Sequence, residues 1–212
     1  MTQHARLLPL GVDEYLEGEL HSPVRHEYVA GRVFAMTGTS RAHNTIAINI
    51  ALALRAHLRG GACRVFMSDL KVRVQKNNAF YYPDIAVSGS CASLRPPHLD
   101  ILPGACHAAD TQTHYLTHPC LVIEVLSPTT EGIDRREKLL AYQTLDSLKE
   151  YVLVNQETMQ VEVYRRESND GGAGGWWVDT YNAGNEAVHL ASVGLTLSMA
   201  AVYEEVVMPF SA

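Results

Sequence analysis

The chain has 212 residues, of which 47% are hydrophobic and 19% are charged, and its formal net charge is -6. This length and balance are typical of one globular domain, so we expect residues 1–212 to fold as a single domain. The negative charge argues against a protein that coats nucleic acid non-specifically, because such binding depends on many Lys and Arg side chains. It is compatible with an enzyme that holds one phosphate through a metal and a local basic patch.

The sequence also indicates where the protein works. No apolar run approaches the roughly 20 residues that cross a bilayer, and the N-terminus lacks the apolar stretch and cleavage pattern of a signal peptide. We therefore expect a cytoplasmic protein without membrane contact. The four cysteines form no CxxC pair, and in a chain without an export signal free thiols are the default.

Polarity patterns predict helices and strands in a mixed order. In chain order, we expect a helix over 12–18, strands over 26–29 and 32–36, a helix over 41–59, strands over 64–67, 70–74, 80–87 and 120–126, a helix over 135–145, strands over 151–154, 161–164, 176–181 and 188–190, and a helix over 199–207. This order favours an α/β (α+β) fold with a mixed β-sheet flanked by helices. Segment 88–119 is the least regular, and loops this long are usually functional or mobile. The Gly-rich stretch 168–175 predicts a hairpin tip.

A carboxylate interrupts the most apolar of the predicted strands. Along this strand Glu124 points to the same side as Val122 and Leu126, and both sides of the strand are apolar. An ionised carboxylate in such surroundings is very costly unless it is paired or bound to a metal. The alternative is that the strand leaves the core at Glu124, whose side chain then reaches solvent or a nearby arginine.

Asp84 is a second acid inside an apolar strand, directly after Pro83. Proline is tolerated at strand edges, strand starts and bulges, so an irregularity is expected there. Two acids on neighbouring strands can hold one divalent cation, because Mg²⁺ takes oxygen ligands from one or two carboxylates, water and phosphate. Asp84 and Glu124 are therefore candidate metal ligands, in a site where a metal would activate water and neutralise phosphoryl charge.

A third feature is the predicted helix that follows. Asp134, Lys138 and Tyr142 are spaced by four residues and share one helix face. If this face packs against the sheet, Lys138 points towards the strand of Glu124, where it can pair with carboxylates, orient water or hold a phosphate. The alternative is an ordinary solvated pair between Asp134 and Lys138 on an exposed helix.

Together these features resemble the PD-(D/E)XK nuclease superfamily, whose sites combine an Asp after a Pro with Glu or Asp, any residue, and Lys. Pro83-Asp84 matches the first half, and Glu124-Val125-Leu126 matches the second half except that Leu126 stands in place of Lys. In several branches that Lys has moved to the next helix, and Lys138 is the candidate here. More narrowly, the chain resembles the Uma-two (Uma2) family of restriction-endonuclease-like proteins. The resembling segments are 25–33, His43, 82–85, 121–128, the spacing of Asp134, Lys138 and Tyr142, and 150–154.

The resemblance implies a restriction-endonuclease-like core and a Mg²⁺- or Mn²⁺-dependent DNA endonuclease. Asp84 and Glu124 then hold the metal with the carbonyl of Val125, Lys138 stabilises charge or positions water, and Glu27 joins the acidic cluster. From the sequence alone, Glu27 is otherwise an edge charge of a short hairpin. Cleavage of both strands of a duplex suggests a homodimer. The candidates for phosphate contact are Arg41, Lys71, Arg73, Arg135 and Arg136.

Two other functions stay open. A non-catalytic protein with this fold could bind nucleic acid or a protein partner, and the acidic net charge and Leu126 favour it. A zinc protein could use Cys and His ligands, although the usual close pairs are mostly missing. The candidate zinc ligands are Cys106, His114, His118 and Cys120. Trp176 and Trp177 could stack on bases, or be a core residue and its exposed neighbour in a strand.

Overall fold

The computed structural model describes residues 9–89, 112–167, 175–184 and 187–208. Its α-helices are α1 (Val12–His21), α2 (Arg41–His57), α3 (Glu131–Ile133), α4 (Leu139–Gln143) and α5 (Met199–Val202). Its strands are β1 (His26–Val29), β2 (Arg32–Ala35), β3 (Arg64–Met67), β4 (Lys71–Val74), β5 (Ala79–Tyr81), β6 (Ile85–Ser88), β7 (Tyr115–Leu116), β8 (Pro119–Leu126), β9 (Glu150–Asn155), β10 (Gln160–Arg166), β11 (Trp176–Asn182), β12 (Ala187–Leu190) and β13 (Leu195–Ser198). A π-helical turn, Asp134–Lys138, joins α3 to α4.

The described strands form a five-stranded sheet ordered β2-β1-β5-β4-β7, a six-stranded sheet ordered β11-β10-β9-β8-β6-β3, and the hairpin β12-β13. Both larger sheets are mixed, because β4 runs parallel to β7 and β8 runs parallel to β9 while their other pairs are antiparallel. The expected mixed α+β architecture is therefore confirmed, with the difference that the strands are divided among several sheets.

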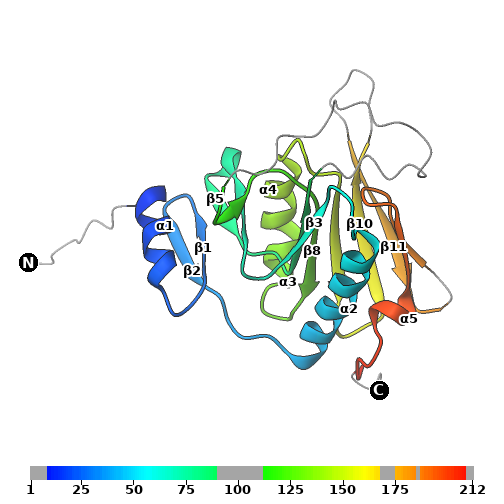
Figure 1. Cartoon of the computed structure of the whole chain (residues 1–212). Coiled ribbons are helices and arrows are strands. Elements are labelled where there is room, and N and C mark those ends of the chain that lie inside the picture. The colour runs from blue at the N-terminus through cyan, green and yellow to red at the C-terminus, as the bar shows by residue number, and fades with distance from the viewer. Residues whose placement is uncertain (1–8, 90–111, 168–174, 185–186, 209–212) are drawn as a thin grey trace, which may run out of the picture.

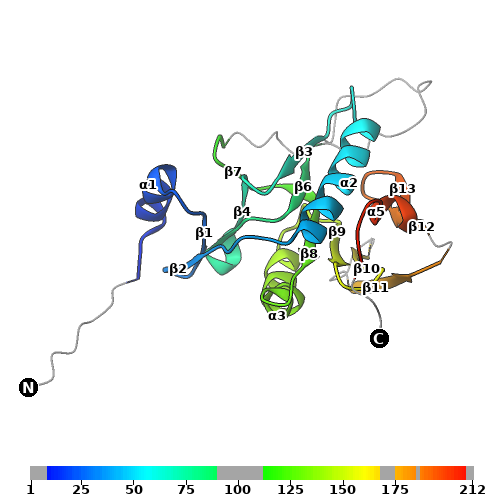
Figure 2. The same cartoon turned by 90° about the horizontal axis from the view of Figure 1, so that it is seen from below.

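The six-stranded sheet lies between two groups of helices (Figures 1 and 2). On one face, α2, α5 and the hairpin β12-β13 pack against residues such as Ile123 and Val152. On the other face, α4 and part of the five-stranded sheet pack against Val122, Leu126 and Leu153. The strand that was expected to be buried on both sides, β8, is buried along its whole length.

The chain crosses from one sheet to the other at a proline. One strand was expected over 80–87, but β5 ends at Tyr81 in the five-stranded sheet and β6 begins at Ile85 in the six-stranded sheet. Pro83 lies between them, where its missing N–H cannot disturb a sheet ladder. Asp84 consequently stands at the junction of the two sheets rather than inside a strand.

Other differences from expectation are local. The helix expected over 135–145 begins earlier and contains the π-helical turn, and the closing helix ends at Val202 instead of continuing to 207. The short strand β7 lies in the segment expected to be irregular, and β13 was not predicted. Ala30 and Gly31 both have positive φ, as the predicted tight hairpin turn requires. The cores of the two expected loops, 90–111 and 168–174, lie outside the described residues.

Two further expectations concern the environment of the protein. No described helix is both long and apolar enough to cross a membrane. Cys63 takes part in a disulfide bond, so the expectation of free thiols is wrong for this residue. The cytoplasmic location stays a prediction.

Candidate active site

Glu124 lies in the middle of the buried strand β8 and is only 4% exposed. Its side chain points to the sheet face that carries Val122 and Leu126, the face covered by α4. The alternative in which the strand leaves the core at Glu124 is therefore wrong. A buried carboxylate at this position requires a charged or hydrogen-bonding partner close by.

That partner is Lys138, the last residue of the π-helical turn. Its Nζ donates to Glu124 Oε1 at 3.2 Å, and it also lies 3.0 Å from Glu27 Oε1 and 3.1 Å from Asp134 Oδ1. The side chains of Lys138, Glu124 and Asp134 are each less than a tenth exposed, and that of Glu27 is 15% exposed. The alternative of a solvated Asp134–Lys138 pair is therefore wrong. The helix face packs against the sheet, and the lysine points inward. Wide turns of this π type are frequent at functional sites.

Glu27 and Asp84 complete the group of acids. Glu27 comes from β1 and accepts a hydrogen bond from the backbone N–H of Tyr82 (3.2 Å). Asp84 follows two residues later, and its Oδ2 accepts from the backbone N–H of Val125 (2.7 Å) while its Oδ1 lies 2.9 Å from Nε2 of His43. We call Glu27, Asp84, Glu124, Asp134 and Lys138 the carboxylate cluster. Its members come from both large sheets and from the π-helical turn.

The strand register indicates whether the carbonyl of Val125 has a partner in the neighbouring strand. Ile85 pairs with Ile123, so a continued antiparallel ladder would place Pro83 opposite Val125. In such a ladder the N–H and the C=O of one residue point to the same neighbouring strand. The N–H of Val125 already bonds to Asp84, and Pro83 has no N–H to offer to the carbonyl. The carbonyl of Val125 therefore receives no hydrogen bond from Pro83 in the neighbouring strand direction and is left available to a ligand.

Burial and like charges set the electrostatics of the cluster. Desolvation raises the pKa of Glu124 well above its ordinary value, and the charges of Asp134, Asp84 and Glu27 raise it further against the opposing effect of Lys138. Desolvation alone would lower the pKa of Lys138, but the charges of Glu124, Glu27 and Asp134 raise it well above its ordinary value. Lys138 therefore stays protonated, in a group of four acids that one ammonium does not neutralise.

Unsatisfied polar atoms are concentrated at the same place. Within the described part of the chain, three buried side-chain atoms lack a hydrogen-bond partner: Nδ1 of His43, Oδ1 of Asp134 and the hydroxyl of Tyr142. Oδ1 of Asp134 has only its ion-pair contact with Lys138. Buried polar atoms are usually hydrogen-bonded, so each exception needs a reason. All three exceptions belong to the cluster or contact it, which is consistent with a site that receives a further partner.

Of the tyrosines beside this site, the sequence pointed to Tyr142 and missed Tyr81 and Tyr151. Tyr142 and Tyr151 are fully buried side by side, with ring centroids 5.3 Å apart, and Tyr81 lies 5.5 Å from Tyr142. Desolvation, followed by the charge of Glu124, raises the pKa of both Tyr142 and Tyr151. The four-residue step from Lys138 was the signal that places Tyr142 here. Tyr81 and Tyr151 carried no signal beyond an ordinary strand pattern.

Several other candidates lie away from the cluster. Arg135 is held by Glu131 and Glu162, Arg136 by the carbonyl of Gly132, and Arg73 lies over the ring of Phe80. Arg41 is exposed at the start of α2. Trp177 is 56% exposed and Trp176 is partly buried beneath Arg166, the arrangement expected of neighbours in a strand. Lys71 is buried in a different pocket, described below.

Among the described residues, no group of three or more His, Cys, Asp or Glu side chains could hold a metal ion. This finding gives the zinc alternative no support, and it applies equally to the acids of the carboxylate cluster. His114 and His118 flank strand β7 rather than one helical turn. Cys120 is buried in β8, where its thiol donates to the carbonyl of Val87. Cys106 lies outside the described residues.

Comparison with known proteins identifies the family of the chain. The sequence profile of the Uma2 family, described as "Putative restriction endonuclease", matches residues 12–200. The chain belongs to the Uma2 family. It is 31% identical over 195 residues to the uncharacterized protein slr1290 of a Synechocystis species, which covers 92% of this chain and 91% of the relative. A second protein of that organism, sll1609, is 26% identical over 153 residues, or 72% and 78% of the two chains.

A solved structure shows the same fold. A crystal structure from Anabaena variabilis, described as a putative nuclease belonging to DUF820, superposes with a TM-score of 0.67. The match covers 94% of this Uma2 chain and 100% of the other, at 18% sequence identity. The fold of the chain is therefore that of a restriction-endonuclease-like protein, as the resemblance implied.

Proposed function

We propose that this Uma2 protein is a Mg²⁺- or Mn²⁺-dependent endonuclease that hydrolyses phosphodiester bonds of DNA. The observation that carries the proposal is the convergence of Glu27, Asp84 and Glu124 from two sheets around the buried Lys138. Burying four acids with one ammonium is unfavourable for folding alone, because uncompensated charge in the interior costs several kcal/mol. A fold retains such an arrangement more readily when the charges serve chemistry.

The donor set suits a divalent cation of this kind. The carboxylates of Asp84 and Glu124 and the carbonyl of Val125 are hard oxygen donors near the C-terminal end of β8. Mg²⁺ usually takes one or two carboxylates and completes its shell with water and substrate phosphate, so a third acidic side chain is not required. When bound, such an ion lowers the pKa of a water molecule and balances charge on the phosphoryl group.

The protein side chains have separate tasks in this proposal. Asp84 is oriented by the N–H of Val125 and by His43, which fixes its carboxylate at the junction of the two sheets. The surrounding acids hold the pKa of Lys138 well above its ordinary value, so its ammonium stabilises the negative charge that develops on the phosphate. Glu27 holds Lys138 in place, and near the more exposed edge of the cluster it can accept a proton from water. Hydrolysis joins a water oxygen to phosphorus, breaks one P–O ester bond and leaves a hydroxyl on the departing strand.

Plasmid cleavage tests the proposal. Supercoiled DNA is incubated with the wild type in Mg²⁺, in Mn²⁺ and in a chelator, beside Asp84→Asn and Lys138→Met. Asp146→Asn is the matched control, because Asp146 is an exposed acid whose ion-pair partner within the described chain is Lys76 alone, at 3.8 Å. The proposal expects metal-dependent nicking by the wild type and the control alone. Equal cleavage by Asp84→Asn, or none by any protein, would contradict it.

One observation favours the non-catalytic alternative. Both carboxylate oxygens of Asp84 already have protein partners, His43 and the N–H of Val125. A nuclease-fold protein that only binds nucleic acid or a protein partner would keep this arrangement without releasing either contact. It would bind DNA equally well with and without metal, which separates it from the enzyme. A homodimer stays part of the proposal for the enzyme, since two sites related by two-fold symmetry cut two strands.

A further inference from the structure

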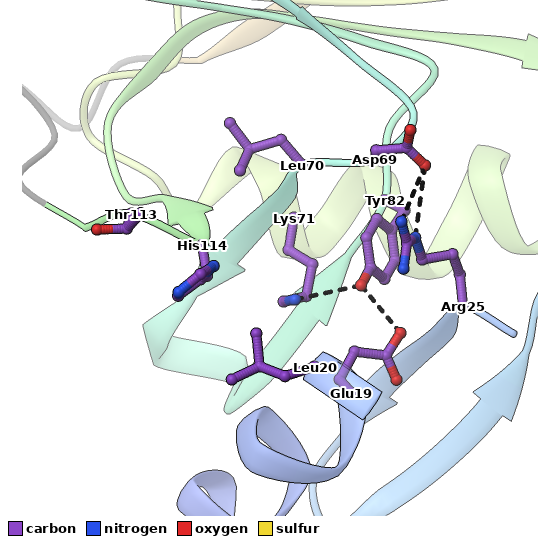
Figure 3. Close-up of a pocket in the computed structure, with 9 residues that line it drawn as sticks. All are labelled: Glu19, Leu20, Arg25, Asp69, Leu70, Lys71, Tyr82, Thr113 and His114. Carbon is purple, nitrogen blue, oxygen red and sulfur yellow. Dashed lines mark hydrogen bonds and ion pairs between the residues drawn. The ribbon is translucent and has the colours of Figure 1, made fainter. Parts of the chain in front are cut away.

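A pocket of about 290 Å³ opens next to the carboxylate cluster, between the end of α1, the start of β4 and the residues before β7 (Figure 3). Tyr82 belongs to both places. Its hydroxyl lines the pocket, and its backbone N–H donates to Glu27 of the cluster. The lining residues are Glu19, Leu20, Arg25, Asp69, Leu70, Lys71, Tyr82, Thr113 and His114.

Lys71 is the unusual member of this lining, because its charged side chain is only 5% exposed. In the described part of the chain its ammonium has a single hydrogen-bond acceptor, the hydroxyl of Tyr82 at 3.2 Å. It also lies over the rings of Tyr82 and Tyr15, 5.2 and 6.0 Å from their centroids. An ammonium has three N–H donors, so two of them have no protein acceptor. Desolvation, assisted by the charge of Arg25, lowers the pKa of Lys71 against the opposing effect of Glu19.

The acids of the pocket are already occupied. Oε1 of Glu19 accepts from the N–H of His26 (2.8 Å) and from the hydroxyl of Tyr82 (2.9 Å), and Oε2 lies 3.1 Å from Nδ1 of His26. Asp69 is engaged with Arg25 at 3.4 Å near the surface. The pocket therefore has spare hydrogen-bond donors on Lys71 and Arg25 and few spare acceptors. A ligand that complements it would be anionic and rich in acceptor oxygens.

We propose that this pocket binds a phosphate group of the nucleic-acid strand, next to the phosphate that is cleaved in the carboxylate cluster. The inference rests on the proposed function, which supplies the strand. Lys71 and Arg25 donate to the phosphate oxygens, and His114 also lines the pocket. Tyr82 couples the pocket to the chain segment that carries Asp84. Such a contact places the strand relative to the site without reading its sequence.

The test measures DNA affinity in the Asp84→Asn background, so that cleavage does not interfere. Binding of a labelled duplex oligonucleotide is followed by anisotropy across a salt series for the parent, Lys71→Met and Lys76→Met. Lys76 is the control because its side chain is 67% exposed and pairs with Asp146. We expect Lys71→Met to weaken binding about tenfold and to lower the salt slope by about one, as for the loss of one phosphate contact, while Lys76→Met changes neither.

Unchanged affinity and slope in Lys71→Met would overturn the proposal, whatever the cleavage assay shows. If that variant does not fold, Arg25→Gln decides, since Arg25 is 45% exposed and its loss should weaken DNA binding a few-fold. A parallel titration with inorganic phosphate identifies the source of the ligand. Suppose that inorganic phosphate binds the parent but not Lys71→Met, while both proteins bind DNA equally well. The pocket would then be an anion site that does not contact the DNA strand, and the proposal would be overturned. If the wild type shows no metal-dependent cleavage but Lys71→Met still binds DNA more weakly than the parent, the proposed function is overturned and the phosphate pocket is not.

Discussion

Two buried acids on neighbouring strands illustrate opposite uses of an interior charge. Glu150 begins β9, directly beside β8, and is 2% exposed. Its carboxylate accepts four hydrogen bonds, from Nε of Arg165 (2.9 Å), the N–H of Ala191 (3.0 Å), and the N–H (2.8 Å) and hydroxyl (2.5 Å) of Ser192. Glu124 lies one strand away and has one hydrogen bond, from Lys138.

The difference shows that burial of an acid does not by itself indicate function. Around Glu150, every acceptor is used, and the acid and Arg165 tie the turn of the C-terminal hairpin to the six-stranded sheet. Around Glu124, acids outnumber cations and buried atoms lack partners. A buried polar network in which every group is hydrogen-bonded makes a fold rigid. A network with unpaired groups and excess negative charge can instead be completed by a cationic ligand.

The largest effect that distinguishes the two regions should be on catalysis. Asp84→Asn and Glu124→Gln should each lower the rate of metal-dependent DNA cleavage by about 10² to 10³-fold, the loss typical of removing one group that stabilises developing charge. Glu150→Gln should leave the rate per folded molecule within about threefold, because its carboxylate bonds only to structural partners. Initial rates of plasmid nicking measure both, and a comparable loss in Glu150→Gln would remove the distinction.

The next largest effect should be on stability, and its response to metal differs between the regions. Lys138→Met and Arg165→Met should each lower the free energy of unfolding by about 3–5 kcal/mol, because each leaves at least one buried acid without its cation. Added Mn²⁺ should restore stability to Lys138→Met, where a cation can rebalance the acids, and should not restore it to Arg165→Met. Urea unfolding with and without Mn²⁺ gives the answer. Rescue of both variants, or of neither, would refute the contrast.

Glu124→Gln should stabilise the protein at neutral pH by on the order of 1 kcal/mol, as relief of strain at a functional site often does. The pKa of Glu124 is higher in the folded than in the unfolded state, so its contribution is fully favourable below the ordinary pKa of glutamate. That contribution is lost as the pH rises towards the folded-state pKa. The variant and the wild type should therefore be equally stable at about pH 4 and differ at pH 7. A neutral-pH loss of stability in thermal unfolding would show that the carboxylate is satisfied after all.

The smallest effect concerns two buried tyrosines. The hydroxyl of Tyr142 has no hydrogen-bond partner among the described residues, so Tyr142→Phe should change the unfolding free energy by less than about 0.5 kcal/mol. Tyr203→Phe is the matched control, because the Tyr203 hydroxyl bonds to Asn155 (2.8 Å) and Gln160 (2.9 Å). It should cost about 1–2 kcal/mol. Equal costs in calorimetric melting curves would mean that Tyr142 has a partner.

Much of this arrangement could be predicted from patterns along the chain. The four-residue spacing of Asp134, Lys138 and Tyr142 correctly placed all three on one helix face, and the structure shows that this face is the buried one. The period of two in β8 correctly placed Glu124 beside Val122 and Leu126. These predictions worked because helix and strand periods are local properties of the backbone.

The rest depends on contacts between distant segments. That Pro83 separates two sheets depends on which strands pair, and the sequence around it predicts only an irregularity. Glu27 reaches Lys138 because β1 joins β5. Glu150 differs from Glu124 through its contacts with Arg165, Ala191 and Ser192. Both acids stand in similar apolar strands, so their opposite surroundings could not be read from spacing.

Calorimetric titration of Mn²⁺ in the presence of a phosphorothioate DNA duplex tests the central claim most directly. The proteins are the wild type, the double variant Asp84→Asn with Glu124→Gln, and Asp146→Asn as the control with an exposed acid removed. If the cluster is a divalent-metal site, the wild type and the control bind Mn²⁺ with equal affinity and the double variant does not. Unchanged binding by the double variant, or no binding by the wild type with the duplex present, would contradict the assignment of this site as a metal-dependent nuclease centre.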